Sequence, residues 1–190
     1  MMNKSNLRTV LVLVVTTVVI LGGVWLVQAQ PWKPQDPSAV STVDVQIPAG
    51  QVGPAVGAVS ADFTASTIDG QTITLSGLRG QPVWLVFGAT WCTNCRAEAP
   101  DVNTVAQTFD GKVKVVSIYV GEDTSTVKGY ADRLKLVTPQ IADTSSQISS
   151  AYSVAGIPAH FFIDSNGVIQ KISVGSITQK TATSILDELS

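Results

Sequence analysis

Residues 82–95 read PVWLVFGATWCTNC, an almost wholly apolar run that leads into two cysteines. The apolar part, from Pro82 to Ala89, is short and uncharged, which is typical of a central strand buried on both faces. A helix is predicted to follow, from about Cys92 to Phe109. The stretch therefore predicts a strand–helix unit that carries both cysteines where the helix begins.

The spacing of the two cysteines favours a redox couple. Cys92 would lie at the helix N-terminus, where unpaired N–H groups and the helix dipole stabilise a thiolate, and Cys95 lies one turn further. Two intervening residues bring the sulfurs within disulfide range while the first thiol stays exposed. The pair can then attack a disulfide, form a mixed intermediate and resolve it. A structural disulfide here would close too short a loop to constrain much of the chain.

Composition limits the other possibilities. The chain has 190 residues, a formal net charge of −2 and a single histidine, His160. A zinc site needs about four ligands, more than two cysteines and one histidine supply, so we expect no metal and no other cofactor. The small net charge gives no sign of a phosphate-binding surface, so nucleic acid is not an expected partner.

Strand and helix patterns alternate through the rest of residues 58–190. The predicted elements are a hairpin about Asp69-Gly70, a strand at 112–120, helices at 124–134 and 145–152, a strand at 160–164, a turn at Asn166-Gly167, a returning strand at 168–174, and a last helix that is capped by Ser176 with Gln179 and ends near Leu189. This order predicts an α/β fold, with a mixed central sheet flanked by helices on both faces.

The first 29 residues predict a membrane anchor. The uncharged run at 9–27, TVLVLVVTTVVILGGVWLV, is about long enough to span a bilayer as one transmembrane helix. Lys4 and Arg8 precede it, so the positive-inside rule puts the N-terminus in the cytoplasm and the C-terminal domain outside. The chain would then be a single-pass protein of the cell membrane. A cleaved signal peptide is the alternative, because Ala29 offers a small residue for a signal peptidase.

Residues 30–57 are predicted to separate this anchor from the folded domain. Five prolines alternate there with three glycines, and no apolar period survives. Repeated prolines favour extended segments without internal hydrogen bonds. We therefore predict a Pro/Gly-rich linker at 30–57 and a single folded domain at 58–190.

The domain resembles the thioredoxin superfamily, specifically the membrane-tethered TlpA/ResA-like thiol-disulfide oxidoreductases. The resemblance is carried by the stretches LRGQPVWLVFGATWCTNCRAEAP, KVKVVSIYVGED and YSVAGIPAHFFIDSNGVI. It implies a thioredoxin-like fold in which Cys92 is the attacking thiol, Cys95 the resolving thiol, and Trp91 a shield for the pair. It also implies that Ile157-Pro158 is a cis peptide facing the disulfide, with the loop before it offering backbone groups to an extended substrate segment.

The same resemblance implies a function outside the cytoplasm. Such a protein exchanges disulfides with exported proteins and is rereduced by a membrane or soluble thiol donor. Reduction of apocytochrome c thiols in cytochrome c maturation is one activity that it suggests. The direction of electron flow depends on the redox potential, which the Thr93-Asn94 dipeptide between the cysteines does not reveal.

Several positions depart from the pattern. Val86 stands where thioredoxin itself carries a buried acid, and Glu98, one helical turn after Cys95, is predicted to replace it by taking the Cys95 proton. The alternative is that Glu98 is a solvated acid of the first helical turn, favoured there by the helix dipole. Gly88 replaces a frequent tryptophan and Asn94 a frequent proline, and both changes bear on the redox potential.

Two other functions are consistent with the residue types. A copper-binding or copper-delivery module of the SCO type could use Cys92, Cys95 and His160. Those proteins separate their cysteines by three residues, however, and we expect His160 to be a structural residue whose replacement leaves exchange nearly unchanged. A peroxiredoxin-like peroxidase is disfavoured because Ala89 and Leu85 stand where threonine and proline precede the catalytic cysteine of that group.

Overall fold

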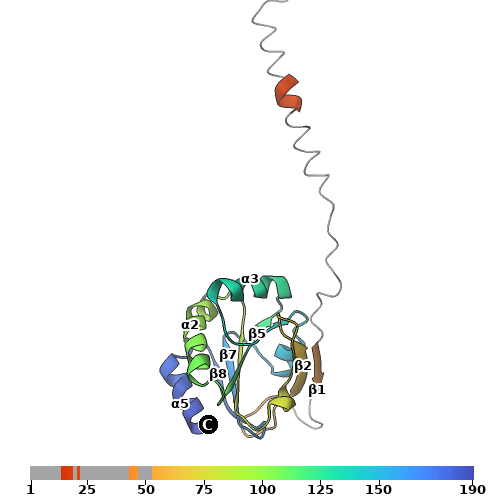
Figure 1. The fold of residues 1–190 in the computed structure, drawn as a ribbon. Coiled ribbons are helices and arrows are strands. Elements are labelled where there is room, and N and C mark those ends of the chain that lie inside the picture. Colours follow the sequence, from red (N-terminus) through yellow and green to blue (C-terminus); the bar gives the residue numbers. More distant parts are fainter. Residues whose placement is uncertain (1–13, 19–20, 22–42, 47–52) are drawn as a thin grey trace, which may run out of the picture. The chain divides into compact units, whose positions relative to one another are not determined.

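The fold was obtained as a computed structural model, which describes residues 14–18, 21, 43–46 and 53–190. Its elements, labelled in Figure 1, are β1 (Val43–Gln46), β2 (Asp62–Ser66), β3 (Thr72–Thr74), the 3₁₀ helix η2 (Leu75–Leu78), β4 (Val83–Gly88), α2 (Thr93–Thr108), β5 (Lys114–Val120), α3 (Thr124–Leu134), β6 (Gln140–Asp143), α4 (Gln147–Ala151), β7 (Ala159–Ile163), β8 (Ile169–Val174) and α5 (Gln179–Leu189).

The main sheet has five strands in the order β6-β5-β4-β7-β8. β4 runs parallel to β5 and antiparallel to β7, and β8 returns antiparallel to β7 as a hairpin. The predicted mixed α/β sheet is therefore confirmed. β4 lies at its centre, and all six of its residues are buried, as the apolar run at 82–89 predicted.

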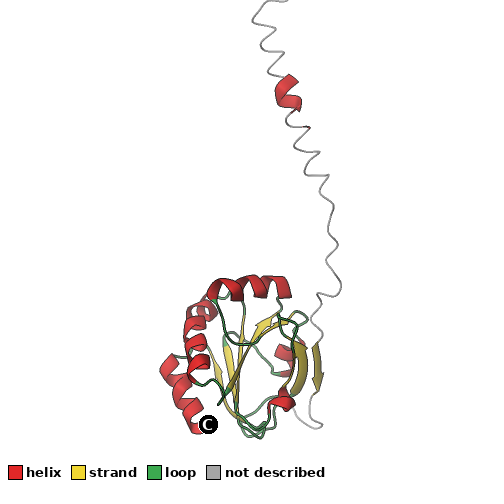
Figure 2. Ribbon diagram, viewed as in Figure 1, coloured by secondary structure: helices red, strands yellow, loops and turns green. Residues whose placement is uncertain are grey.

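Each face of this sheet is covered by different elements (Figure 2). Trp84 and Val86 of β4 pack with α2 and α5 on one face, whereas Leu85 and Phe87 pack with α4 and β2 on the other. Successive side chains of a strand point to opposite faces, so the apolar run fills both cores at once. The arrangement fixes the end of β4, and with it the start of α2, between two packed layers.

A second sheet has three strands in the order β1-β2-β3, and of these only β1 lies outside the part of the chain that was predicted to be folded. β1 pairs antiparallel with β2, Val43 opposite Ala65 and Val45 opposite Phe63. Both valines pack against the core through the alternation VDVQ. Within the predicted 30–57 linker, these four residues therefore form a strand of the folded unit.

Three local predictions need correction. β6 was not predicted, because the strand has only four residues. The strand expected at 112–120 begins at Lys114. The last helix is capped by Thr178, whose side chain accepts a hydrogen bond from the Thr181 N–H, and not by Ser176.

The predicted membrane anchor falls largely outside the described residues. Residues 14–18 and 21 are helical. Among the residues that the structure describes, no helix has the length and apolar character needed to cross a bilayer.

Candidate active site

Cys92 and Cys95 form a disulfide at the N-terminus of α2. Cys92 is the N-cap residue of the helix, and its Sγ accepts a hydrogen bond from the Cys95 N–H at 3.2 Å. A helix N-terminus offers unpaired N–H groups that stabilise a thiolate once the disulfide opens. The predicted strand–helix junction is therefore confirmed, with both sulfurs at the predicted point.

The exposure of the two residues differs from the expectation. Cys92 is only 7% exposed, whereas Cys95 is partly exposed. The prediction that the first thiol stays open is wrong for this disulfide form, because the sulfur of Cys92 lies 4.0 Å from the Ile157 carbonyl oxygen. That loop covers the residue.

The covering loop contains the Ile157-Pro158 peptide, which is cis. Pro158 is buried and lies in the same cavity wall as Cys95. Its carbonyl oxygen accepts the Gly175 N–H at 2.8 Å, which ties the loop to the end of β8. Trp91, the residue before Cys92, is 70% exposed, so its side chain is available to a docking partner.

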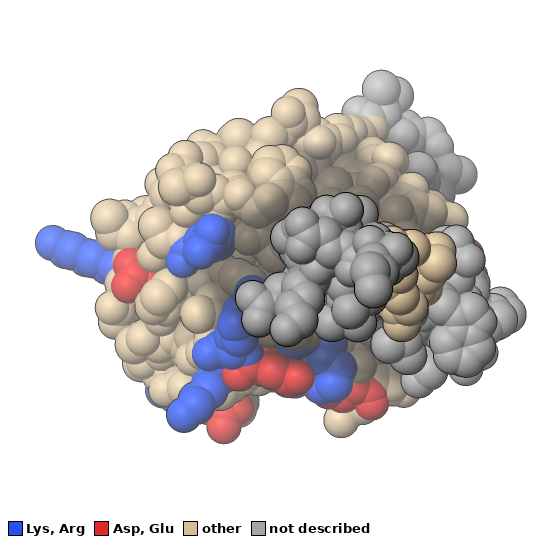
Figure 3. All heavy atoms as spheres, turned by 90° about the horizontal axis from the view of Figure 1, so that it is seen from above, with Lys and Arg blue, Asp and Glu red and all other residues tan. Residues whose placement is uncertain are grey.

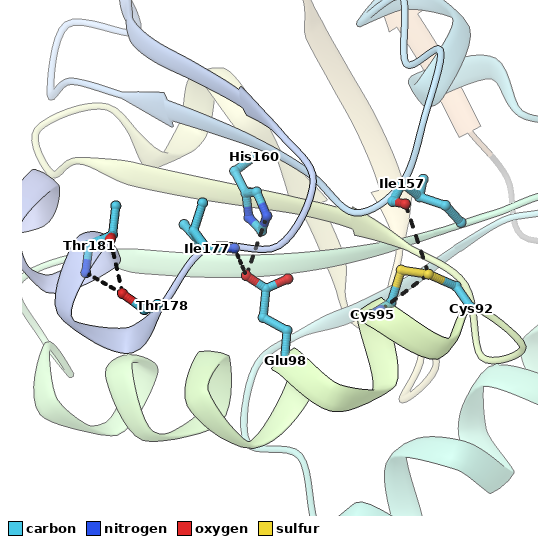
Figure 4. Close-up of polar contacts among 8 residues, drawn as sticks. All are labelled: Cys92, Cys95, Glu98, Ile157, His160, Ile177, Thr178 and Thr181. Atoms are coloured by element: carbon cyan, nitrogen blue, oxygen red, sulfur yellow. Dashed lines mark hydrogen bonds and ion pairs between the residues drawn. A yellow bond between two sulfur atoms is a disulfide. The ribbon is translucent and has the colours of Figure 1, made fainter.

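Glu98 is buried on the sheet side of α2, with 6% of its surface exposed. The alternative of a solvated first-turn acid is therefore wrong. Its Oε1 accepts the Ile177 N–H at 2.9 Å and lies 3.4 Å from Nε2 of His160 (Figure 4). Burial raises the pKa of Glu98 to about 7; the Ile177 hydrogen bond lowers the pKa and the charge of Asp101 raises it.

Glu98 and Cys95 line one cavity of about 40 Å³. Val86, Gly88 and Pro158 also line this cavity. The volume exceeds the roughly 10–15 Å³ that one water molecule requires. The cavity is therefore large enough for a water molecule to carry a proton between Cys95 and the Glu98 carboxyl group.

His160 lies on β7 directly opposite Val86 of β4. Its side chain is fully buried, and burial lowers the pKa of the imidazole to about 4, while a contact with the Gly175 backbone raises it. Figure 4 shows the ring directed at Glu98 and away from the sulfurs of Cys92 and Cys95. Among the described residues, no three His, Cys, Asp or Glu side chains are grouped to hold a metal ion. The arrangement therefore does not supply the histidine that the copper alternative needs.

Comparison with known proteins now decides the family. Residues 56–172 match the AhpC/TSA family. The chain belongs to this family. It is 33% identical over 136 residues to thiol-disulfide oxidoreductase ResA of Geobacillus thermodenitrificans, an alignment that covers 71% of this chain and 78% of that protein.

Solved structures agree with this assignment. A thioredoxin-family thiol:disulfide interchange protein from Chlorobium tepidum superimposes with a TM-score of 0.66 at 27% identity, over 72% of this chain and 99% of that one. DsbF of MTB superimposes with a TM-score of 0.63 at 27% identity, over 67% of this chain and 94% of that one. This AhpC/TSA-family protein is accordingly a thiol-disulfide oxidoreductase of the ResA/DsbE type with a thioredoxin-like fold, as the sequence resemblance implied.

Sequence reasoning missed one acidic residue of this AhpC/TSA-family site. Glu122, in the turn after β5, binds Thr90 in the loop that leads to Cys92. The two residues are 32 positions apart, and only the parallel pairing of β4 with β5 brings the ends of these strands together. The available signal was the position of Glu122, a charged residue two positions after the end of the buried strand β5.

Charged side chains occupy little of the face that Figure 3 draws. On the face drawn in Figure 3, most of the surface is uncharged, and the basic and acidic side chains that appear are mixed along one side. A partner that docks on this face meets mainly neutral groups.

Proposed function

We propose that this protein is a membrane-anchored, extracytoplasmic reductant of disulfides in exported proteins, with the cysteine pair of apocytochrome c as its substrate. The observation that carries the proposal is the Cys92–Cys95 disulfide at a helix N-terminus, with the buried Glu98 in the wall of the cavity that Cys95 lines. A membrane or soluble thiol donor would restore the reduced form. The curated relative named ResA supports the reaction class.

The cysteines have separate roles in this reaction. The Cys92 thiolate attacks one sulfur of the substrate disulfide, which breaks the substrate S–S bond and leaves a mixed disulfide and one substrate thiolate that takes a proton from water. The Glu98 carboxylate accepts the proton of Cys95. The Cys95 thiolate then attacks Sγ of Cys92, which breaks the mixed disulfide and releases the second substrate sulfur as a thiolate that takes a proton from water, and Glu98 returns its proton to the solvent. Two electrons have passed to the substrate, and the protein is left in the disulfide form that the structure shows.

The substrate segment would lie along the loop before Pro158. The Ile157 carbonyl oxygen faces the sulfur of Cys92, and an extended peptide can donate an N–H to such a group. The exposed Trp91 directly precedes Cys92 and offers an apolar contact. These three residues are the proposed substrate-binding groups.

The location rests on the sequence. The run at 9–27 and the preceding Lys4 and Arg8 support an anchor with the domain outside the cytoplasm. Protease added outside intact cells should remove the chain beyond about residue 30 and leave the N-terminus protected. A soluble product that begins near Gln30 would show instead that the segment is cleaved as a signal peptide.

The direction of exchange is tested by equilibrium titration of the full chain in detergent. A reductant should keep its disulfide in millimolar glutathione and lose it in dithiothreitol. The reduced protein should also open the disulfide of a Cys-x-x-Cys-His peptide, the haem-attachment sequence, with equal numbers of peptide thiols formed and protein thiols lost. Complete reduction by glutathione, or no reaction with the peptide, would contradict the proposal.

A further inference from the structure

The Glu98 carboxyl group meets a titratable partner that the exchange reaction does not itself require. His160 is the only histidine of the chain, is fully buried, and has its Nε2 3.4 Å from Oε1 of Glu98. Among the described residues, neither ring nitrogen makes a hydrogen bond of good geometry, although Nε2 faces Oε1 of Glu98. A buried polar ring without a good partner is costly, so the Glu98 carboxylate is the group that a small shift would bring into hydrogen-bond geometry with Nε2.

The hydrogen bonds around Glu98 decide which atom carries the proton between the two groups. Oε1 already accepts the Ile177 N–H at 2.9 Å, and a backbone N–H can only donate. The same oxygen faces Nε2 of His160 at 3.4 Å, so a hydrogen bond between the two groups would have Oε1 as its acceptor. The neutral imidazole then carries its hydrogen on Nε2. A proton arriving from Cys95 must bind the other carboxyl oxygen, which points away from His160 and Ile177, toward the disulfide side of the close-up in Figure 4.

The surroundings contain few other charges that compete with this contact. On α2 the neighbouring acid is Asp101, whose charge disfavours the carboxylate form of Glu98. From β4, the strand opposite, the residue facing His160 is the apolar Val86, and Trp84 packs on the imidazole with ring centroids 5.9 Å apart. On the β8 side the Gly175 backbone also faces a ring nitrogen, and this contact, which raises the pKa of the imidazole, competes with Glu98 for the single hydrogen of the neutral ring. Among the described residues that line the cavity with Glu98, the other titratable groups are Cys95, Tyr119 and Tyr130, and burial raises the pKa of both tyrosines.

We propose that His160 is a positioning residue for Glu98: its Nε2–H donates to Oε1 and holds the carboxylate in the orientation, and at the proton affinity, that the Cys95 proton transfer needs. The inference rests on the proposed role of Glu98. Together Ile177 and His160 fix one carboxyl oxygen and leave the other free toward Cys95. Because a donor stabilises the carboxylate more than the acid, His160 keeps the pKa of Glu98 lower than burial alone would set it. This proposal departs from the sequence-based expectation that replacing His160 leaves exchange nearly unchanged.

The composition of the chain makes the proton positions directly measurable. With a single histidine, ¹⁵N labelling of histidine in the oxidised full chain reports the tautomer of His160 alone. With only Glu98, Glu122 and Glu188 as glutamates, ¹³C labelling of glutamate carboxyl groups gives three signals. The first expected result is an Nε2–H tautomer of His160 at pH 7. The second is a titration of the Glu98 carboxyl group near neutral pH. Neither cysteine titrates in this experiment, because Cys92 and Cys95 are joined in the disulfide. An Nδ1–H tautomer would overturn the proposal.

Two variants separate donation from packing. His160→Phe keeps a ring but removes the donor, so the pKa of Glu98 should rise by about one unit. His160→Gln places an amide N–H at similar reach and should bring the titration back toward that of the parent protein. Phe162→Leu, on the same strand and the same sheet face, is the matched control. It lowers stability through the core contact with Trp84 without moving the Glu98 titration.

Exchange kinetics provide the functional readout. The pH midpoint of exchange should rise by the same amount in His160→Phe as the Glu98 titration does, and should recover in His160→Gln. In a Glu98→Gln background, His160→Phe should leave the pH profile where it is. A rate loss in His160→Phe that persists in that background, or equal profiles in His160→Phe and Phe162→Leu, would show that His160 is merely structural.

The failure of this inference and the failure of the Glu98 role are distinguishable. If Glu98→Gln leaves the pH profile of exchange unchanged, the role of Glu98 fails. If that profile changes but the His160 variants do not move the Glu98 titration, only the positioning role fails.

Discussion

Glu122 holds Thr90 with both of its carboxylate oxygens: Oε2 accepts the Thr90 N–H at 2.7 Å and Oε1 accepts the Thr90 hydroxyl at 2.6 Å. Thr90 stands two residues before Cys92, and Glu122 is 9% exposed. Thr144 in turn donates its hydroxyl to the Glu122 carbonyl oxygen at 3.0 Å. The loop that presents the disulfide is thus fixed by a buried acid from the neighbouring strand end.

Replacing Glu122 by glutamine should loosen this loop. An amide presents only one acceptor oxygen, so one of the two Thr90 bonds is lost and an N–H group faces a donor. We expect a loss of about 1–3 kcal/mol in the free energy of unfolding and slower exchange, measured by urea unfolding and by reduction of a peptide disulfide.

Variants of Thr90 provide the control. Thr90→Ser keeps both hydrogen bonds and should behave as the parent protein, whereas Thr90→Val removes only the hydroxyl bond. The double variant with Glu122→Gln should lose less than the sum of the single losses, because both act on one contact. Additive losses would mean that the two residues are energetically independent.

Replacing Cys95 by serine should trap mixed disulfides between Cys92 and its partners. The attacking thiol at the helix N-terminus remains while the resolving thiol is gone, so the intermediate persists. Non-reducing gels of cells carrying this variant should show adducts that dithiothreitol releases. Cys92→Ser should show none, and equal trapping by both variants would reverse the assignment of roles.

Replacing Glu98 by glutamine should remove an ionisation from the pH profile of exchange. The carboxyl group accepts a proton only when ionised, and its pKa is about 7, so the parent rate should rise as the pH passes from 6 to 8. The variant should be slower by about tenfold or more at pH 8 and should lack that rise. Superimposable profiles would exclude Glu98 as the proton acceptor.

The same carboxyl group should make folding stability depend on pH. The folded pKa of Glu98, about 7, lies above its ordinary value of 4.5, so its contribution is fully present below pH 4.5 and is lost as the pH rises through 7. The stability of the oxidised parent protein relative to Glu98→Gln should therefore fall across that window, by no more than about 3 kcal/mol. Urea unfolding at a series of pH values measures it, and a constant difference would argue against a raised pKa.

His160 should make the folded protein less stable as the pH falls, which is the opposite of the effect of Glu98. Its folded pKa, about 4, lies below its ordinary value of 6.5, so its contribution is present above pH 6.5 and is lost as the pH falls through 4. In His160→Gln, the free energy of unfolding should depend less on pH below about pH 6.5 and should be nearly unchanged in its pH dependence near neutrality. If the free energy of unfolding of His160→Gln falls as steeply at acid pH as that of the parent protein, other groups cause the loss of stability.

The parts of the site that the sequence predicted are those set by short-range patterns. The apolar run before Cys92 defines both β4 and the start of α2, and the spacing of Cys92 and Cys95 brings the sulfurs together within one helical turn. Glu98 follows because residues three apart share a helix face. The cis peptide before Pro158 came from resemblance, and no local pattern would have indicated it.

The parts that were missed depend on contacts between distant segments. Glu122 meets Thr90, and His160 meets Glu98, only because the sheet order places their strand ends and faces together. The cap of the last helix was misplaced for the same reason. The Ile177 N–H donates to Glu98, and α5 begins only after Thr178.

Replacing Asp143 by alanine should unfold the connection between β6 and α4, two elements that the sequence reading missed or placed too broadly. Asp143 is fully buried at the end of β6, where one carboxylate oxygen accepts the Ile148 N–H at 3.2 Å and the other accepts the N–H and hydroxyl of Ser149, each at 2.8 Å. The N-cap residue of α4, Ser146, makes no side-chain capping bond, so Asp143 satisfies the first turn of this helix in its place. Loss of the carboxylate leaves buried donors unpaired, and we expect about 2–4 kcal/mol of destabilisation by urea unfolding.

The matched control is Ser149→Ala, which removes only one of the three bonds to Asp143 and should cost about 1 kcal/mol. Equal losses in the two variants, or protection of the Ile148 amide from hydrogen exchange in Asp143→Ala as complete as in the parent protein, would show that α4 does not depend on this carboxylate.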